Sequence, residues 1–129
     1  MQQRLGARAE YRQEEGQRVK GSITLAEKFQ TLKALTIDST HWSADSGTKS
    51  GQVNFSVNLQ RAKSIVRVQC PNSECVRGDF DLTEVLTTAV AAQRKSVDGE
   101  LVCRGWRSRT TIDTVPCGNI LRYKITLAY

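Results

Sequence analysis

Hydrophobic and polar side chains alternate along five stretches of this chain, and each stretch predicts a β-strand. The alternation is clearest in residues 53–59 and 120–129, where a period of two indicates one buried and one solvent-facing side. Residues 35–42, 64–70 and 100–106 show the same pattern over fewer positions. The three strands that precede residue 71 follow one another closely, so we expect them to form an antiparallel meander.

Two other stretches carry hydrophobic residues at the spacing of one helix face. Residues 23–32 predict a short helix that Ser22 or Thr24 can cap. Residues 81–94 predict the main helix, and Asp81 fits the first position of a capping box. The element order therefore predicts an α+β fold, with a small, mostly antiparallel sheet of about five strands, one main helix and a short N-terminal helix.

The first 22 residues differ in composition from the rest of the chain. Gln, Arg, Glu and Gly dominate there, and sizeable hydrophobic residues are few. Such a segment buries too little apolar surface to offset the entropy lost on ordering. We therefore predict a flexible tail at residues 1–22 and a single domain at residues 23–129. The whole chain has 129 residues and is 39% hydrophobic, which suits one domain with a modest core.

Four cysteines fall near strand ends or in the adjoining turns, at Cys70, Cys75, Cys103 and Cys117. Ends of this kind can converge at one edge of a small sheet. Zinc binds four thiolates in a tetrahedron, and a four-cysteine set leaves no open position for chemistry. We therefore predict one structural Zn²⁺ that clamps the domain. Disulfides and free thiols stay open as alternatives, because the C-x4-C and C-x13-C spacings are not those of paired C-x2-C knuckles.

No hydrophobic run approaches the roughly 20 residues of a membrane span, and the N-terminal residues lack the apolar region of a secretory signal. These features predict a cytoplasmic protein. Thiols stay reduced in that compartment, which favours metal binding over disulfides.

Motifs for catalysis are not evident in the sequence. A Ser–His or Cys–His arrangement would require His41, the only histidine, whose neighbours form no motif. There is no glycine-rich phosphate loop, G-x-S-x-G or H-E-x-x-H. We therefore predict that the protein is not an enzyme. His41 either replaces one cysteine as a metal ligand or is a structural residue of its strand.

Positive charge is concentrated in the last part of the chain. The whole chain has a net charge of +6, whereas residues 101–129 carry five basic residues and one acidic residue, and residues 70–100 carry three basic and six acidic residues. An arginine-rich loop that contains a tryptophan and is held by zinc can contact phosphates and stack on a base. The predicted nucleic-acid contacts are Arg104, Trp106, Arg107, Arg109, Arg122 and Lys124.

The leading functional prediction is a non-enzymatic binding module whose first expected partner is RNA or DNA. The same residues also allow a simpler interpretation, in which the arginines form a solvated loop and Trp106 covers the core. The alternative function is then a protein–protein adaptor or assembly subunit with a purely structural zinc. In that case the last strand, residues 120–129, is expected to offer an exposed edge for pairing with another chain.

Overall fold

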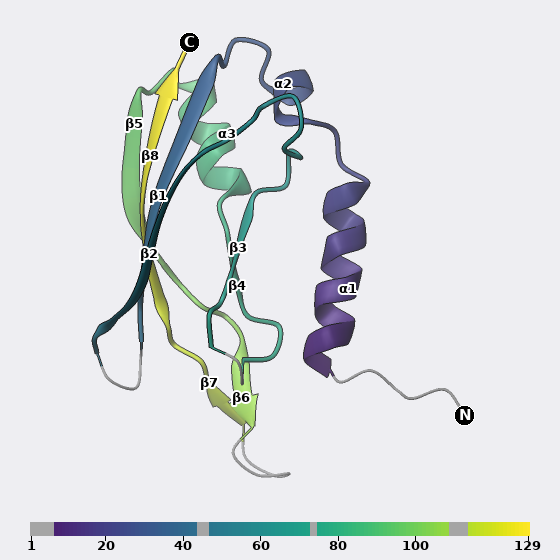
Figure 1. Cartoon of the computed structure of the whole chain (residues 1–129), viewed down its shortest axis with the longest axis vertical. Coiled ribbons are helices and arrows are strands. Elements are labelled where there is room, and N and C mark those ends of the chain that lie inside the picture. The colour runs from purple at the N-terminus through teal and green to yellow at the C-terminus, as the bar shows by residue number, and fades with distance from the viewer. Residues whose placement is uncertain (1–6, 44–46, 73–74, 109–113) are drawn as a thin grey trace.

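The fold is seen in a computed structural model, which describes residues 7–43, 47–72, 75–108 and 114–129. It is the predicted α+β class, and the described residues form a four-stranded antiparallel sheet, two short two-stranded ribbons and three helices (Figure 1). In chain order the elements are α1 (Ala7–Lys20), α2 (Leu25–Lys28), β1 (Ala34–Trp42), β2 (Lys49–Ser56), β3 (Arg67–Gln69), β4 (Asp79–Asp81), α3 (Thr83–Ala91), β5 (Ser96–Val102), β6 (Trp106–Ser108), β7 (Thr114–Pro116) and β8 (Ile120–Ala128).

The main sheet has the strand order β2-β1-β8-β5. The predicted alternation of the last strand is confirmed, because Leu121, Ile125 and Leu127 are buried while Arg122 and Lys124 are exposed. The expectation that this strand offers an exposed edge is wrong. Strand β8 pairs with β1 on one side and with β5 on the other, so β2 and β5 are the edge strands.

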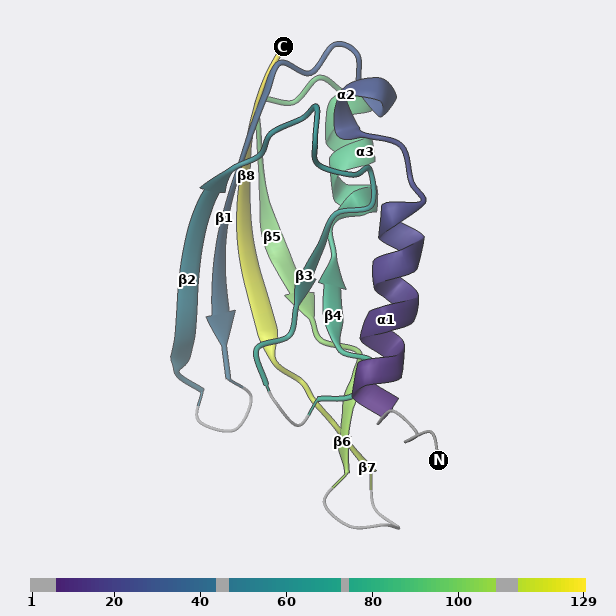
Figure 2. The same cartoon turned by 45° about the vertical axis from the view of Figure 1, so that its right-hand side comes forward.

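The main core lies between the inner face of the sheet and the helices α2 and α3, which lie on the same side of it (Figure 2). Helix α3 contributes Leu86 from its buried face, and α2 contributes Leu25. These residues pack in one cluster with Ile37 of β1 and Ile125 of β8, and all four are at most 1% exposed. Burial of these apolar side chains stabilises the packing of the helices against the sheet.

Both predicted helices form, with shorter bounds. Thr24 caps α2 by accepting a hydrogen bond from the backbone N–H of Glu27. At the start of α3 the N-cap is Leu82, and the Asp81 carboxylate accepts the N–H of Thr83 at 2.9 Å. Asp81 thus lies one residue before the N-cap, whereas the prediction placed it at the N-cap. From there it still accepts a hydrogen bond from a backbone N–H that has no partner within the helix.

The predicted three-stranded meander is wrong beyond its first hairpin. Strand β3 pairs with β4 instead of β2, and Val68 lies opposite Phe80. The chain leaves the sheet after β2 because its connection bonds to the segment around α2: Leu25 and Ala26 donate their backbone N–H groups to the carbonyls of Ala62 and Leu59. These bonds carry the chain across to the inner side of the sheet.

The region around Gly99 also differs from the prediction. The strand predicted to begin at residue 100 begins earlier, because Asp98 and Gly99 also lie within β5, where Gly99 is paired with Tyr123 of β8. A β-carbon at Gly99 would lie 2.5 Å from the hydroxyl oxygen of Tyr123. Glycine is therefore needed here so that the tyrosine ring can cross over the neighbouring strand. The predicted strand at residues 100–106 is divided between the end of β5 and the start of β6.

The segment predicted as a flexible tail contains helix α1. Its Tyr11 hydroxyl donates a hydrogen bond to the Asp79 carboxylate at 2.7 Å, and its Glu15 forms an ion pair with Arg67. Arg67 also pairs with Asp79 across the β3–β4 ribbon, and only 10% of its side chain is exposed. Polar contacts thus hold α1 against the ribbon, which the composition of the segment did not indicate. The boundary between tail and domain at residues 22 and 23 stays a prediction.

No helix within the described ranges is long and apolar enough to span a lipid bilayer.

Candidate metal centre

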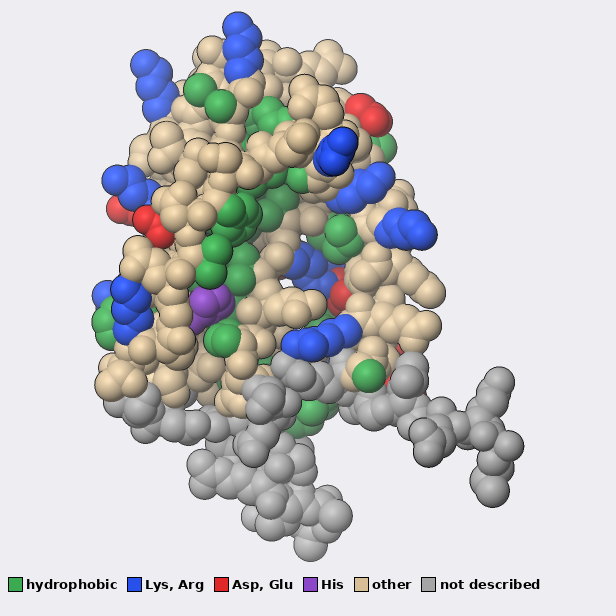
Figure 3. All heavy atoms as spheres, viewed as in Figure 1, with side chains coloured by type: hydrophobic (Ala, Val, Ile, Leu, Met, Phe, Trp, Pro, Cys, Tyr) green, Lys and Arg blue, Asp and Glu red, His purple; other side chains and the backbone are tan. Residues whose placement is uncertain are grey.

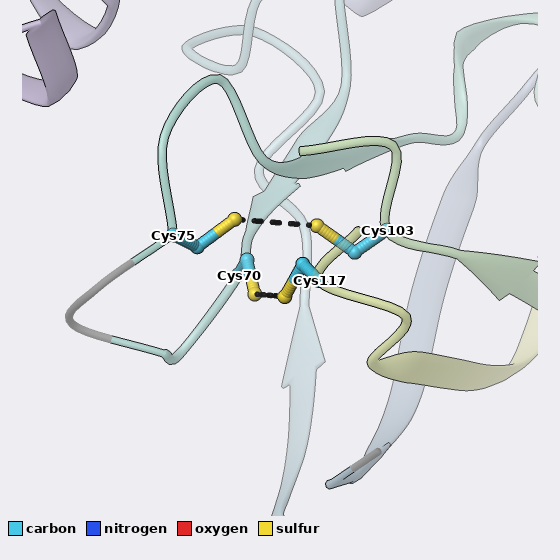
Figure 4. Close-up of side chains that lie close together, drawn as sticks. All are labelled: Cys70, Cys75, Cys103 and Cys117. Carbon is cyan, nitrogen blue, oxygen red and sulfur yellow. Dashed lines mark hydrogen bonds between the residues drawn. The ribbon is translucent and has the colours of Figure 1, made fainter. Parts of the chain in front are cut away.

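The four cysteines lie where the two short ribbons meet the end of the main sheet, and their side chains point toward one another (Figure 4). Cys70 directly follows β3, and Cys75 lies in the connection from β3 to β4. Cys103 directly follows β5, and Cys117 directly follows β7. Three of the cysteines directly follow a strand and Cys75 lies in a connection between strands, as the sequence predicted, and segments distant in sequence are brought together.

Backbone hydrogen bonds hold these strand ends in place. Val76 and Trp106 form an isolated antiparallel bridge, with N–H to carbonyl distances of 2.8 and 3.0 Å in the two directions. The N–H of Cys103 donates to the carbonyl of Asn119 at 2.8 Å. These bonds tie the β3–β4 connection to β6, and the end of β5 to the start of β8.

The sulfur atoms have the spacing of ligands around one metal ion. All four Sγ atoms lie within 4.8 Å of one another, and the separations are 3.5 Å for Cys75 to Cys103 and 3.7 Å for Cys70 to Cys117. Metal–sulfur bonds of about 2.3 Å in a tetrahedron place the sulfurs about 3.8 Å apart. A disulfide requires about 2.05 Å. The arrangement therefore matches a tetrahedral thiolate site better than two disulfides.

Two glycines complete the walls of the site. A β-carbon at Gly78 would overlap the sulfur of Cys75, and a β-carbon at Gly105 would lie 2.5 Å from the same atom. Neither glycine has a positive φ, so close packing rather than backbone conformation requires them. Since the four cysteine side chains are also at most 3% exposed, the site is closed to solvent on the sides formed by described residues.

The thiols of the cluster influence one another's ionisation. The hydrogen bond from the Cys103 thiol stabilises the thiolate of Cys70 and lowers the pKa of Cys70 to about 5. The reciprocal effect, together with burial, raises the pKa of Cys103. Burial raises the pKa of Cys75 to about 12. Without a cation the site therefore holds a thiolate readily at Cys70 and keeps protons on Cys75 and Cys103, because buried negative charges repel one another.

Polar hydrogens next to the sulfurs favour their charged form. The backbone N–H of Gly105 points to the Cys103 sulfur at 3.4 Å, and the side-chain amide of Asn119 points to the Cys70 sulfur at 3.7 Å. Donors of this kind orient metal ligands and stabilise thiolates. The residues present therefore fit a metal ion: four soft donors, closely spaced, buried and supported by N–H groups.

His41 does not belong to the four-ligand cluster. It is 7% exposed, its ring lies 5.7 Å from that of Phe80, and burial lowers its pKa. Its Nδ1 atom is buried and has no hydrogen-bond partner among the described residues. The structural interpretation of His41 as a packed strand residue therefore fits its environment better than a role as ligand.

Among the predicted nucleic-acid contacts, Arg104 lies apart from Arg122 and Lys124. Arg104 is exposed and lines a cavity of about 960 Å³ beside α1, β4 and α3. Arg122 and Lys124 line a different cavity, of about 470 Å³, on the outer face of the sheet. There Arg122 pairs with Glu100 at 2.5 Å and lies 5.0 Å from the ring centre of Trp42. Arg109 lies outside the described residues. Arg107 is described in its backbone only.

Trp106, the aromatic member of the predicted set, is half-buried at the start of β6. Its backbone is fixed by the bridge to Val76, so it stands next to the cysteine cluster rather than at the tip of the hairpin. This position agrees with the interpretation in which the tryptophan covers part of the core.

Three residues of the site were not found from the sequence. Gly78, Gly105 and Asn119 each follow a cysteine by two or three positions, and that proximity is the signal that sequence reasoning passed over. Gly78 and the N–H of Gly105 lie against the sulfur of the preceding cysteine, whereas the Asn119 amide reaches the sulfur of Cys70 on a distant segment.

No family model matches this sequence, and no curated protein or solved structure is significantly similar to it. The fold and the site define a small α+β domain with a buried four-cysteine cluster that can hold a metal ion.

Proposed function

We propose that the cluster holds one structural Zn²⁺ and that the protein is a non-enzymatic binding module. The observation that carries the proposal is the closed set of four buried sulfurs, all within 4.8 Å of one another. Thiolate donors in tetrahedral order favour zinc, and a site with four protein ligands has no position for a substrate. The ion would be held by Cys70, Cys75, Cys103 and Cys117.

The role of such an ion is mechanical. The strands of both ribbons have three residues each, and two-stranded pieces of this size are not stable alone. Zinc, bound to the four cysteine sulfurs, would link the two ribbons to each other and to the end of the main sheet. It would thereby fix the β6–β7 hairpin, which carries the arginine-rich segment, in a defined position.

Nucleic acid is the first partner we propose for this hairpin. The support comes from the charge of the segment and from Arg104, which is exposed and has no carboxylate within ion-pair distance among the described residues. The outer face of the sheet supports it less. Arg122 and Lys124 share their cavity with three carboxylates, so that face offers phosphates no net attraction: Asp38, Asp98 and Glu100.

A protein–protein adaptor or assembly subunit is the second candidate. One observation favours it: the edge strand β2 exposes Val53 and Phe55, at 51% and 38% of their surfaces. Large hydrophobic side chains on an unpaired strand are typical of a surface that binds another polypeptide.

Metal content tests the first part of the proposal. Elemental analysis of the purified chain is expected to give one zinc per chain, and a chelator is expected to lower the unfolding temperature. Cys70→Ser, directly after β3, and Cys103→Ser, directly after β5, are expected to lose the metal and most of the folded protein. A metal-free wild-type chain that unfolds at the same temperature with and without chelator would exclude a structural zinc.

Salt-dependent binding tests the partner. Fluorescence anisotropy with mixed-sequence RNA and DNA oligonucleotides is measured for the wild type and for the triple variant Arg104→Ala, Arg107→Ala, Arg109→Ala. Loss of three phosphate contacts is expected to weaken binding. The slope of the logarithm of the binding constant against the logarithm of the salt concentration is expected to be less steep by about 2 for a single strand. The matched control, Arg122→Ala with Lys124→Ala, is expected to bind like the wild type. Unaltered binding by the triple variant would contradict the hairpin as the contact surface.

A further inference from the structure

The edge of β2 is open along its whole length. This strand pairs with β1 on one side, and no described strand pairs with its other side. Natural proteins protect such edges with charged residues, prolines or bulges. Residues 51–56, GQVNFS, contain neither charge nor proline, and the irregularity in the pairing with β1 lies outside them, at Ser50 between Gly51 and Lys49.

Two hydrophobic side chains of β2 face inward but lie outside the core. Val53 is paired with Ser39 and Phe55 with Ile37, and both partners are buried on the inner face of the sheet. Val53 and Phe55 therefore point to that same face, yet they are 51% and 38% exposed. The helices cover the sheet from β5 to β1 and leave the inner side of β2 open. Figure 3 shows hydrophobic side chains exposed on this side of the molecule.

Alternate backbone N–H and C=O groups of β2 point toward its open edge, where a further strand can pair with them. Val57 donates its N–H to the carbonyl of Leu35 at 2.9 Å. Hydrogen-bonded pairs recur at every second residue of an antiparallel ladder, so Phe55, Val53 and Gly51 turn their N–H and C=O groups toward β1. The intervening residues turn theirs to the open edge: Gln52, Asn54 and Ser56.

The side chains of β2 are complementary to a second copy of the same strand. When two copies run antiparallel about a two-fold axis at Val53, each Val53 lies opposite the partner's Val53. Each Phe55 then lies opposite Gly51 of the partner subunit. A β-carbon at Gly51 would meet no atom within 4 Å, so the space above this glycine is open. An aromatic ring placed across from a glycine fills such a space and stabilises the strand pair.

The same register satisfies the outward-facing backbone groups and creates no charge repulsion. Gln52 and Asn54 of the partner subunit form a hydrogen-bonded pair, and the two-fold axis repeats this pair on the other side of Val53. The only charged residue of the strand is Lys49, and the two copies of it lie at opposite ends of the paired segment. The uncharged residues 51–55 offer no electrostatic feature for a different partner, whereas their pattern fits a second copy of itself over five residues.

We propose that this protein forms a two-fold dimer in which β2 pairs antiparallel with β2 of a second copy about Val53. The two main sheets then form one continuous eight-stranded sheet, and Val53 and Phe55 of both copies lie in a shared apolar strip. The dimer depends neither on the metal ion nor on nucleic acid, because β2 contributes no residue to the cysteine cluster.

The mass of the full, metal-loaded chain in solution tests the dimer. Sedimentation velocity over a concentration series is expected to give a species of twice the 14.4 kDa of one chain. Phe55→Asp is expected to weaken association about 100-fold, since both copies lose a central apolar contact. Asn54→Pro removes an N–H that points to the open edge and is expected to do the same while the fold is kept. The control Ile23→Asp changes a side chain that is 50% exposed outside the sheet and is expected to remain dimeric.

A cross-linking experiment tests the register. Residues that face each other in a non-hydrogen-bonded pair have Cα atoms about 4.5 Å apart, within the range of a disulfide. Val53→Cys is therefore expected to give a covalent dimer on mild oxidation, and Gln52→Cys, which faces the partner's Asn54, is expected to give much less. A wild-type chain that is monomeric at every concentration overturns the proposal, and so does a dimer that Phe55→Asp and Asn54→Pro leave intact. Association only with a different protein also overturns it.

Discussion

Gly78 and Cys75 lie so close together that a β-carbon on the glycine would overlap the cysteine sulfur. The same β-carbon would lie 2.6 Å from the sulfur of Cys103. Gly78 therefore sits against two of the four sulfurs and allows the β3–β4 connection to fold over the cluster. The geometry of the candidate metal site thus depends on the absence of a side chain as much as on the four cysteines.

Gly78→Ala is expected to disrupt the metal site. The added methyl group must displace the sulfur of Cys75 or the surrounding backbone, and a displacement of this size breaks tetrahedral coordination. We expect at least tenfold weaker metal binding, measured by competition with a chelating indicator, which corresponds to about 1.4 kcal/mol or more. The matched control is Gly16→Ala, where a β-carbon would meet no atom within 4 Å. Equal metal affinity in both variants would contradict the close contact.

Metal affinity is expected to rise with pH. Cys75, with a pKa raised to about 12 by burial, and Cys103, with a raised pKa, both carry protons at pH 7 when no metal is bound. Metal binding must release these two protons, so the apparent affinity is expected to increase by at least about 100-fold per pH unit near neutrality. Cys70, with a pKa of about 5, is already a thiolate there and adds to the slope only in more acidic solution. Indicator competition between pH 6.5 and 7.5 measures the slope, and a pH-independent affinity would contradict the proton count.

The contact between α1 and the β3–β4 ribbon is expected to depend on Asp79. Asp79→Asn leaves the buried Arg67 with Glu15 as its remaining carboxylate partner and weakens the acceptor of the Tyr11 hydroxyl. Loss of a charged hydrogen-bond partner at a buried site costs about 1–3 kcal/mol. We expect this decrease in the free energy of unfolding by urea, together with faster amide exchange throughout α1.

The control for this variant is Glu100→Gln. It breaks the ion pair between Glu100 and Arg122, whose side chains are 51% and 59% exposed. Pairs at such exposure contribute at most about 1 kcal/mol, and amide exchange in α1 is expected to stay unchanged. If both variants have the same small effect and α1 exchanges at the same rate in each, the ribbon contact does not hold the helix.

Leu86→Ala is expected to destabilise the domain without direct effect on the metal site. Leu86 is fully buried in the main core, and truncation of a leucine at such a position costs about 2–5 kcal/mol. Thr87→Ala, at an exposed position of the same helix, is expected to change the free energy of unfolding by about 0.5 kcal/mol or less. Metal stoichiometry of the folded Leu86→Ala protein is expected to remain that of the wild type, and loss of metal from its folded form would show that core and site are coupled.

Local patterns predicted the elements whose packing follows from their own sequence. The alternation in residues 120–129 correctly identified the buried face of β8, and the helical spacing in residues 81–94 identified α3 with Leu86 on its buried side. The position of each cysteine at a strand end predicted the cluster. Side-chain periodicity is a property of one element, so it can be recognised before the partners of that element are known.

Pairing between strands was less predictable. Strand β2 has the same alternation as β8, yet its Val53 is half-exposed because no element among the described residues covers it. Strand β3 was expected beside β2, whereas hydrogen bonds to the α2 region direct the chain elsewhere. Alternation indicates that a strand has an apolar side, but it does not contain information on which element packs there.

The sequence by itself determined the α+β class, the main helix, the central alternating strand and the set of four cysteines. Each of these depends on residue type and spacing along the chain. Only the tertiary structure decided that the sulfurs meet at ligand distances, that Gly78 and Gly105 give them room, that α1 lies on Arg67 and that β2 is an open edge. These features depend on contacts between residues far apart in sequence, and such contacts are fixed only when the whole chain has packed.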